Sequence, residues 1–454
     1  MSSANRVLNL LRYRQTIKRT DTCRINGRVV QVIGVLVESQ GPACSVGEIC
    51  LIECGRNQEN VKAEVVGFRE SRTLLMPYGE VHNIRPDCRV IATGSQLRVP
   101  MGRALLGRVL DGLGNPIDGK GPVPCDGSIC AAGQPPHPLS RKRISEPLSL
   151  GVRAIDGILS VGRGQRMGIF AGSGVGKSTL LGMMARNTSA DVNVISLVGE
   201  RGREVRDFIE RDLGEEGLAR SVVVVATSDT VPVVRLRGAQ VATGIAEYFR
   251  DMGLDVLLMM DSVTRVAWAQ REIGLASGEP PTTRGYTPSV FAVLPSLLER
   301  SGTSAKGSIT GLYTVLVEGD DMNEPVADTV RGILDGHIVL SRDLAARNHY
   351  PAIDVLSSVS RLMPEITDRP RRDRAGRLRD VLSTYRSSED LINIGAYTSG
   401  SNPRIDYALG KIEEVNAFLR QRTDEVSDFD EAGAALEGIF GDGEEVPVQI
   451  ADAA

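Results

Sequence analysis

The sequence predicts an α/β protein in which a parallel-sheet core follows a small β-barrel and precedes a helical region. Between about residues 150 and 365, apolar runs alternate with helical patterns, which is typical of a parallel sheet covered by helices. Residues 21–95 instead consist of short β-rich runs broken by Gly, Pro and Asn, as in a barrel. After about residue 369 the chain becomes helical and charged. At 454 residues it is long enough for two or three domains.

Residues 1–20 form a basic stretch before the barrel. The stretch contains no acidic residue, and its cations are Arg6, Arg12, Arg14, Lys18 and Arg19. Its apolar residues recur at helical spacing and are Val7, Leu10, Leu11 and Ile17. This pattern predicts a basic amphipathic helix that docks against a partner helix or touches an anionic membrane. The alternative is a frayed, solvated terminus.

The barrel region, residues 21–95, is a poor candidate for a nucleic-acid module. From Cys23 to Ser95 the only aromatic residues are Phe68 and Tyr78, and basic and acidic residues are equal in number. Binding of single strands needs stacking platforms and a cationic groove. The whole chain also carries a net charge of −4. We therefore expect a structural collar and no nucleic-acid partner.

Neither the cysteines nor the apolar runs predict a metal site or a membrane span. All seven cysteines lie in the first 130 residues, and their spacing matches no zinc-binding pattern. We expect them to be reduced, small apolar side chains. No apolar run approaches the roughly eighteen residues needed to span a bilayer, and the N-terminus lacks the apolar core of a signal peptide. The sequence therefore predicts a soluble, cytoplasmic protein.

The core domain is predicted to span residues 96–368. Its first part, to about residue 150, is rich in Gly and Pro, with a turn cluster at Asp111–Pro116 and an extended segment at Pro135–Pro138. This part is expected to bridge the barrel and the sheet. The later strands of the core are predicted at Asn193–Val198, Val222–Ala226, Val256–Met260, Thr314–Val317 and Ile338–Leu340.

The stretch from Met167 to Thr179 has the order apolar strand, glycine-rich loop, lysine and helix start. The loop and first helical turn consist of Gly172, Ser173, Gly174, Val175, Gly176, Lys177, Ser178 and Thr179. Glycines let backbone N–H groups converge on phosphate oxygens, and the helix N-terminus adds its positive dipole end. We expect Lys177 to reach the β- and γ-phosphates and Ser178 to hold Mg²⁺. Ala171 stands where the usual pattern has a glycine, but the later glycines still allow close approach.

Two carboxylates that come after predicted strands are expected beside this loop. Asp261 ends a buried strand at the carboxyl edge of the sheet, where it can hold the water shell of magnesium. Glu200 and Arg201 begin an acid–base cluster after the strand predicted at Asn193–Val198. Glu200 is the candidate that positions and polarises the water attacking the γ-phosphate. The alternative is an ion-paired helix start that uses Glu200 or Glu204.

Residues 369–454 are predicted to be a helical domain with an acidic tail. The domain begins with a run of arginines, namely Arg369, Arg371, Arg372, Arg374, Arg377 and Arg379. Such a run usually forms a solvated face. From Asp424 to the end there are ten acidic residues and no basic one, so the last 20 or so residues are expected to be a mobile tail.

Longer blocks add to the loop and the carboxylates. They are Leu106–Gly112, Pro116–Gly119, Gly199–Arg201, Glu318–Pro325, Tyr350–Asp354 and Ser358–Arg361. With these blocks the chain resembles the catalytic subunits of the rotary ATP synthase superfamily, and within it most closely the export ATPases of flagellar and related type III secretion systems. The resemblance covers nearly the whole chain after residue 20. It implies a RecA-like P-loop core that binds ATP and Mg²⁺ and powers protein export.

The resemblance also implies an assembly. The family forms a ring of six subunits with nucleotide at each interface, a head-to-tail arrangement closed by rotation. Arg361 matches the arginine offered in trans to the neighbour's γ-phosphate, and Tyr350 matches the position whose ring stacks on adenine. The alternatives are a structural ion pair between Arg361 and Asp354, and core packing for Tyr350.

The implied partners are proteins of an export system. They are an elongated regulatory protein that binds residues 1–20 and holds the ATPase inactive, a coiled-coil stalk protein in the ring, the export gate, chaperones and export substrates. The implied location is cytoplasmic, peripheral at the inner-membrane export apparatus, with contact to an anionic membrane.

Three functions compete on the sequence alone. An export ATPase is favoured by the block Glu318–Pro325 and the short C-terminal helical domain, whereas an ion-coupled ATP synthase subunit predicts a different sequence at that block. A ring-shaped RNA translocase is disfavoured by the neutral, aromatic-poor barrel. The intact Lys177 and Glu200 favour a hydrolysing subunit over a regulatory one. Within the export class, Gly172–Gly176 and Asp321–Asn323 favour the flagellar branch over the injectisome branch.

Overall fold

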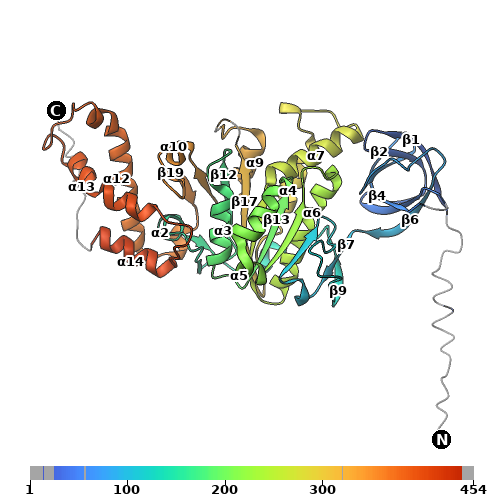
Figure 1. The fold of residues 1–454 in the computed structure, drawn as a ribbon, viewed down its shortest axis with the longest axis horizontal. Helices are drawn as coiled ribbons and strands as arrows, with labels where there is room; N and C mark the ends of the chain where they lie inside the picture. The colour runs from blue at the N-terminus through green and yellow to red at the C-terminus, as the bar shows by residue number, and fades with distance from the viewer. Residues whose placement is uncertain (1–13, 15–24, 56–57, 318, 320, 442–454) are drawn as a thin grey trace, which may run out of the picture. The chain divides into compact units, whose positions relative to one another are not determined.

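The computed structural model describes residues 14, 25–55, 58–317, 319 and 321–441. The chain divides into two compact units, Met1–Gln96 and Leu97–Ala454. The first contains the barrel, and the second contains the large sheet and the C-terminal helices (Figure 1). Apart from Arg14, the predicted basic helix at residues 1–20 lies outside the described residues.

The first unit is a closed antiparallel barrel with the strand order β1-β2-β5-β4-β3-β6. Its strands are β1 (Gly27–Ile33), β2 (Leu36–Gln40), β3 (Glu48–Glu53), β4 (Val61–Arg69), β5 (Arg72–Pro77) and β6 (Arg89–Gln96). Side chains alternate across each strand, so Val37, Ile52, Val65 and Val90 fill the interior. Closure leaves no strand edge unpaired, which confirms the predicted barrel.

The second unit is built on a nine-stranded sheet with the order β19-β18-β12-β17-β15-β13-β14-β8, and β16 pairs with β17. Its strands are β8 (Arg108–Asp111), β12 (Arg166–Ala171), β13 (Val192–Val198), β14 (Ser221–Ala226), β15 (Asp255–Asp261), β16 (Gly302–Thr303), β17 (Ser308–Leu316), β18 (Gly336–Leu340) and β19 (Ile353–Ser360). The pairs β16–β17 and β18–β19 are antiparallel, and the others are parallel. The predicted parallel core is therefore confirmed, with antiparallel additions.

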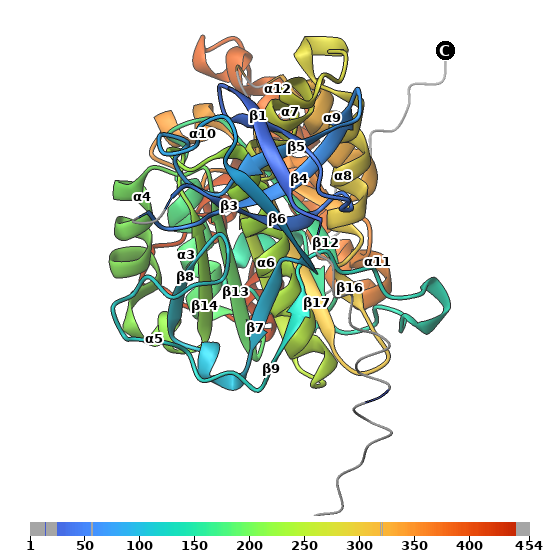
Figure 2. The same ribbon diagram turned by 90° about the vertical axis from the view of Figure 1, so that its right-hand side faces the viewer.

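β8 comes from the stretch that the sequence predicts only as a bridge. It pairs in parallel with β14, from Arg108 opposite Val222 to Asp111 opposite Val225, and Figure 2 shows β8, β14 and β13 next to one another. The buried Arg108 guanidinium donates to both carboxylate oxygens of Asp118, at 2.7 and 2.9 Å. These hydrogen bonds hold the pKa of Asp118 well below its usual range. Part of the bridge is thus an edge strand of the core.

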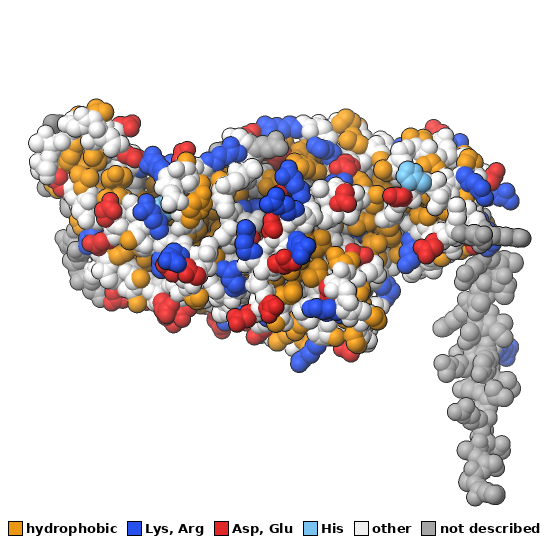
Figure 3. Space-filling model, in the orientation of Figure 1, with side chains coloured by type: hydrophobic (Ala, Val, Ile, Leu, Met, Phe, Trp, Pro, Cys, Tyr) orange, Lys and Arg blue, Asp and Glu red, His pale blue; other side chains and the backbone are white. Residues whose placement is uncertain are grey.

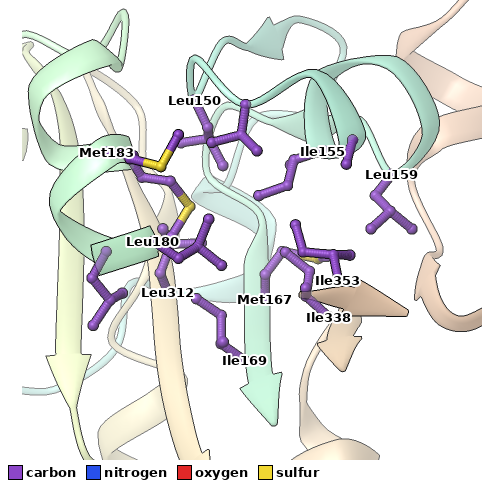
Figure 4. Close-up of a cluster of buried hydrophobic side chains, with 14 of the residues drawn as sticks. Leu150, Ile155, Leu159, Met167, Ile169, Leu180, Met183, Leu312, Ile338 and Ile353 are labelled. Carbon is purple, nitrogen blue, oxygen red and sulfur yellow. The ribbon is translucent and has the colours of Figure 1, made fainter. Parts of the chain in front are cut away.

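Helices cover both faces of this sheet. They are α2 (Arg153–Ile158), α3 (Lys177–Asn187), α4 (Gly202–Asp207), α5 (Gly214–Ala219), α6 (Pro232–Asp251), α7 (Val263–Ser277), α8 (Pro288–Leu298), α9 (Pro325–Ile333) and α10 (Arg342–Ala346). Successive residues of a strand point to opposite faces. Met259 of β15 therefore packs in the cluster that contains Leu180 of α3, and Leu258 packs with Phe249 of α6. Figure 4 shows Leu180 beside Leu312 of β17 in the first cluster.

Three longer helices follow β19 and the short helix α11 (Met363–Ile366). They are α12 (Arg369–Asn393), α13 (Pro403–Leu419) and α14 (Phe429–Ile439). The prediction of a solvated arginine face on α12 is wrong for three residues that contact other elements: Arg371 stacks on the Phe429 ring at 3.5 Å, Arg374 pairs with Glu437 at 3.2 Å, and Arg379 donates to the Ser358 carbonyl at 3.3 Å. These guanidinium groups reach α14 and β19 because α12 packs against both of these elements as well as against α13 and α2.

The first part of the predicted acidic tail is helical, because α14 occupies Phe429–Ile439. Asp428 and Glu431 form a capping box at its start, and Leu436 and Phe440 are buried. The cap and the apolar face offset the acidic charge of this stretch. Residues 442–454 of the predicted tail lie outside the described residues.

The face of the molecule drawn in Figure 3 carries basic and acidic side chains interspersed with one another. This mixture fits a chain whose net charge is only −4. Within the described ranges, no helix has the length and hydropathy to cross a membrane.

Candidate active site

The phosphate loop connects the end of β12 to the start of α3. β12 lies between β17 and β18, so the loop emerges at the carboxyl edge of the sheet. Gly174 and Gly176 have φ angles of +80° and +85°, a region that favours glycine. Ala171 still pairs with Leu316 and Leu340 as part of the strand. A glycine is not required there because the chain is extended, which explains the departure from the usual pattern.

Lys177, Glu200 and Asp261 form one cluster beside the loop. β13 and β15 are neighbours that end at the same edge as β12, which brings Glu200 and Asp261 to it. The Lys177 Nζ lies 2.5 Å from Asp261 Oδ1 and 3.5 Å from Glu200 Oε1. The Thr314 hydroxyl donates to Asp261 Oδ1 at 2.7 Å. Both carboxylates are buried, with 3% of Asp261 and 7% of Glu200 exposed.

The surroundings of Glu200 raise the pKa of its carboxyl group. Burial raises the pKa of Glu200 to about 7, and repulsion from Asp261 adds to the rise, whereas Lys177 and Arg265 oppose it. The Arg265 Nη2 lies 3.5 Å from Glu200 Oε1. A hydrogen bond with Glu200 lowers the pKa of Glu204. Oε1 of Glu200 is buried and makes no hydrogen bond within the described part of the chain. Such an oxygen can accept one from a water molecule.

Two clefts open at this edge of the sheet. The first, of about 580 Å³, is lined by the phosphate loop, Lys177, Ser178 and Glu200. The second, of about 470 Å³, is lined by one face of α3, Tyr350 and residues 420–425. Gly176 and Thr179 line both clefts. A molecule with phosphates in the first cleft can therefore place an attached base in the second.

Tyr350 stands at the second cleft with an exposed ring. Its exposed fraction is 42%, so the alternative role in core packing is wrong. A Cβ built on Gly176 would lie 3.5 Å from the ring, which places the ring directly beside the last glycine of the loop. A flat, accessible aromatic surface at this position is suited to stacking on a base.

Ser178 and Asp261 offer the type of ligand that Mg²⁺ prefers. The exposed Ser178 side chain lines the first cleft with Lys177, and Lys177 in turn contacts the Asp261 carboxylate. Hydroxyl and carboxylate oxygens are hard ligands, and Mg²⁺ is commonly held by one or two of them together with substrate phosphates and water. The donor set therefore fits a magnesium ion that arrives with a nucleotide.

Two predicted site residues lie outside the cluster of Lys177, Glu200 and Asp261. The Arg201 side chain is 79% exposed at the mouth of the first cleft and lies 3.4 Å from Glu204. Arg361 is exposed and comes directly after β19, whose last residue pairs with Gly336 at the start of β18. The phosphate loop leaves the sheet beside Leu340, at the end of β18. Arg361 therefore lies at the opposite edge from the loop of its own chain.

The alternative predicted for Arg361, an ion pair with Asp354, is also wrong, because Asp354 has other partners. The Asp354 carboxylate accepts hydrogen bonds from the Arg386 guanidinium at 3.3 Å and from the Ser357 hydroxyl at 2.9 Å. The acid is thus occupied by α12 and its own strand. The exposed Arg361 guanidinium lies in neither cleft of its own chain.

Several side chains of the clefts were not predicted from the sequence. Arg265 had a local signal, because Ser262 directly after Asp261 is the N-cap of α7 and places Arg265 on the first turn. No local sequence signal indicated Arg342, although a Cβ built on Gly172 would lie only 2.6 Å from its guanidinium. Residues 420–425 had none either, because they reach the cleft from the far end of the chain.

Comparison with known proteins finds three family models that match successive parts of the chain. Family models match for the nucleotide-binding domain of the ATP synthase alpha/beta family at residues 151–360, its beta-barrel domain at 29–94, and the T3SS EscN ATPase C-terminal domain at 367–438. A flagellum-specific ATP synthase of Bacillus subtilis (strain 168) is 57% identical, over 94% of this chain and 98% of the relative. A type 3 secretion system ATPase of Xanthomonas euvesicatoria is 53% identical, over 92% and 94%.

A solved structure extends the likeness to three dimensions. It is the assembled ATPase EscN in complex with its central stalk EscO, from the type III secretion system of enteropathogenic E. coli. The match has a TM-score of 0.84 and 43% sequence identity, and it covers 91% of this chain and 99% of that chain.

A parallel sheet that ends in a phosphate loop, with a lysine–carboxylate cluster beside it and a second cleft adjoining the first, defines a P-loop nucleoside triphosphatase. With its barrel and C-terminal helices, the chain belongs to the ATP synthase alpha/beta family, among the flagellar and type III secretion ATPases. The predicted family and fold class are confirmed. The protein is therefore a nucleotide-binding ATPase of this family.

Proposed function

We propose that the protein hydrolyses ATP at the cluster of Lys177, Glu200 and Asp261 and thereby drives export of flagellar components. The observation that carries the site is the contact of the loop lysine, which lines a cleft of about 580 Å³, with two buried carboxylates. One positive and two negative side chains are thereby available for phosphate, metal and water in the same place.

Each side chain has a separate task in this proposal. Lys177 exchanges its contact with Asp261 for oxygens of the β- and γ-phosphates and neutralises their charge, together with the backbone N–H groups of the loop. Ser178 and Asp261 would hold Mg²⁺, which would supply positive charge against the charge that develops on the transferred phosphoryl group. Glu200 accepts a hydrogen bond from the attacking water and polarises it. Arg201, at the cleft mouth, balances the acidic cluster.

Replacing Lys177 with alanine tests the site. We expect ATP hydrolysis to fall at least about 10²-fold, because one preorganised positive charge is lost from the transferred phosphate. The measurement is steady-state phosphate release together with calorimetric ATP binding. The matched control is Lys306→Ala, an exposed lysine in the turn before β17, which should behave like the parent. Turnover by Lys177→Ala near the parent rate contradicts the site.

The pKa of Glu200 predicts how activity depends on pH. The carboxylate is the active form, and because burial raises its pKa to about 7, it is mostly protonated below that pH. We expect kcat/KM, which reports the free enzyme, to rise about ten-fold per pH unit below pH 7 and to level off above it. In Arg265→Ala the midpoint should move to higher pH, because a cation that favours the carboxylate is removed. A flat profile through pH 7 rules out a titrating Glu200.

We infer that the active form is a ring of six copies in which Arg361 serves the neighbouring subunit. Two observations support this: EscN is described as an assembled ATPase with a central stalk, and Arg361 lies at the sheet edge opposite its own loop. The proposed partners are a coiled-coil stalk protein in the ring, an elongated regulator that binds residues 1–20, the export gate, chaperones and export substrates. The proposed location is the cytoplasmic face of the inner membrane, as a peripheral protein.

Assignment to the flagellar branch rests on two short stretches, Gly172–Gly176 and Asp321–Asn323. Relatives that carry flagellar and type 3 secretion names both match along nearly the whole chain. The gene neighbourhood tests the branch: flagellar rod and hook genes support it, and injectisome needle genes contradict it.

A further inference from the structure

Residues 420–425, the base-side segment, form one wall of the second cleft. The segment joins α13 to α14 and faces α3 and Tyr350 across the cleft. It belongs to the C-terminal helices, whereas the phosphate loop and Tyr350 belong to the sheet core. The position of this wall therefore depends on whatever fixes the segment to the core.

Gln421 joins the segment to the core through several hydrogen bonds. Its side chain is buried, with 5% exposed, and uses its amide fully. Its Oε1 accepts from the Arg153 backbone N–H at 2.8 Å, and its Nε2 donates to the carbonyls of Gly151 at 2.9 Å and Glu425 at 3.0 Å. Its own backbone N–H donates to the Tyr350 carbonyl at 3.0 Å. One residue thus connects the start of α2, the base-side segment and the residue with the stacking ring.

Two arginines of the core hold the same segment from other directions. Arg153 of α2 pairs with Glu425 of the segment at 3.1 Å, and its Nε donates to the carbonyl of Phe418, near the end of α13, at 3.0 Å. Arg186, in the last turn of α3, donates to the Thr423 carbonyl at 2.9 Å. α3 starts at the phosphate loop, so the helix that carries Lys177 also anchors the base-side segment.

We propose that Gln421 is a positioning residue for the nucleobase. By holding the base-side segment in place, Gln421 sets the affinity for ATP and leaves the phosphate site unaffected. This rests on the proposed ATPase site. The amide is suited to the role because its acceptor and both donors are used at once, and no charged side chain of similar size can do the same between an N–H group and two carbonyls. Base and phosphates are thereby held by parts of the chain that can be perturbed separately.

Comparing ATP with inorganic tripolyphosphate separates the two halves of the site, because tripolyphosphate has no base. In Gln421→Ala we expect the Kd for Mg-ATP to rise about ten-fold, since three buried hydrogen bonds are lost. The Kd for Mg-tripolyphosphate should stay within about two-fold of the parent. Gln270→Ala is the control, because this buried glutamine binds Ser289 and lines neither cleft. Its two Kd values should stay at the parent level.

Two further variants cover the case in which Gln421→Ala does not fold. Gln421→Glu keeps the size and the acceptor but loses both donors, and Arg186→Ala loosens the segment at Thr423 without touching Gln421. Each should weaken the binding of ATP but not the binding of tripolyphosphate. Equal weakening of ATP and tripolyphosphate, or no change in either, overturns the role of Gln421. Because calorimetric binding needs no turnover, a parent protein that binds both ligands but does not hydrolyse ATP overturns the proposed function alone.

Discussion

Replacing Glu200 with glutamine is expected to lower ATP turnover by about 10²- to 10⁴-fold while ATP binding stays near the parent value. The amide has the shape of the carboxyl group but no charge with which to polarise a water molecule. The contact of Lys177 with Asp261, at 2.5 Å, does not involve Glu200 and should remain. Phosphate release measures turnover, and calorimetry measures binding.

The matched control for this variant is Glu210→Gln. Glu210 is an exposed glutamate that pairs with Arg206 at 2.7 Å on the outer side of the same part of the chain. It should leave turnover unchanged. If Glu200→Gln hydrolyses ATP at close to the parent rate, the attacking water is oriented by another group.

Replacing Arg361 with alanine is expected to reduce the rate by about 10³- to 10⁵-fold, the range seen when an arginine that contacts the transferred phosphate is removed. The fold of the isolated chain should be retained, because this side chain is exposed and comes directly after the last residue of β19. The two inactive proteins Lys177→Ala and Arg361→Ala should recover turnover when mixed. A mixed ring contains interfaces that pair an intact loop with an intact arginine.

A double variant provides the control for mixing. Lys177→Ala combined with a protein that carries both substitutions leaves every interface without a loop lysine, so no turnover should return. If mixed rings of the two single variants form but stay inactive at every ratio, Arg361 does not act in trans.

The parts of the site that come from local sequence were predicted correctly in position. The loop, Glu200 and Asp261 each lie at the carboxyl end of a buried strand, and parallel strands bring the residues at their carboxyl ends to one edge of the sheet. That geometry can be read without knowing the strand order. The family resemblance supplied Tyr350 and Arg361, whose surroundings carry no such local signal.

The parts that depend on long-range packing could not be predicted. The base-side segment reaches the second cleft only because α13 and α14 pack on α2, and nothing near Gln421 in the sequence indicates this. The arginines of α12 look solvated in sequence, yet Arg371 and Arg379 are used as contacts to other elements. β8 reads as part of a Gly- and Pro-rich connection because it is only four residues long.

The pairing of β8 with β14 bears on where the chain can be cut. The nucleotide-binding family model begins at residue 151, which suggests that the ATPase domain could be produced from there. A protein that begins at residue 151 would lack β8 and would leave the backbone groups of Val222–Val225 without partners along one edge of the sheet. β14 is entirely apolar after its first serine, and an exposed strand of this kind templates aggregation. A soluble ATPase fragment should therefore begin before residue 108.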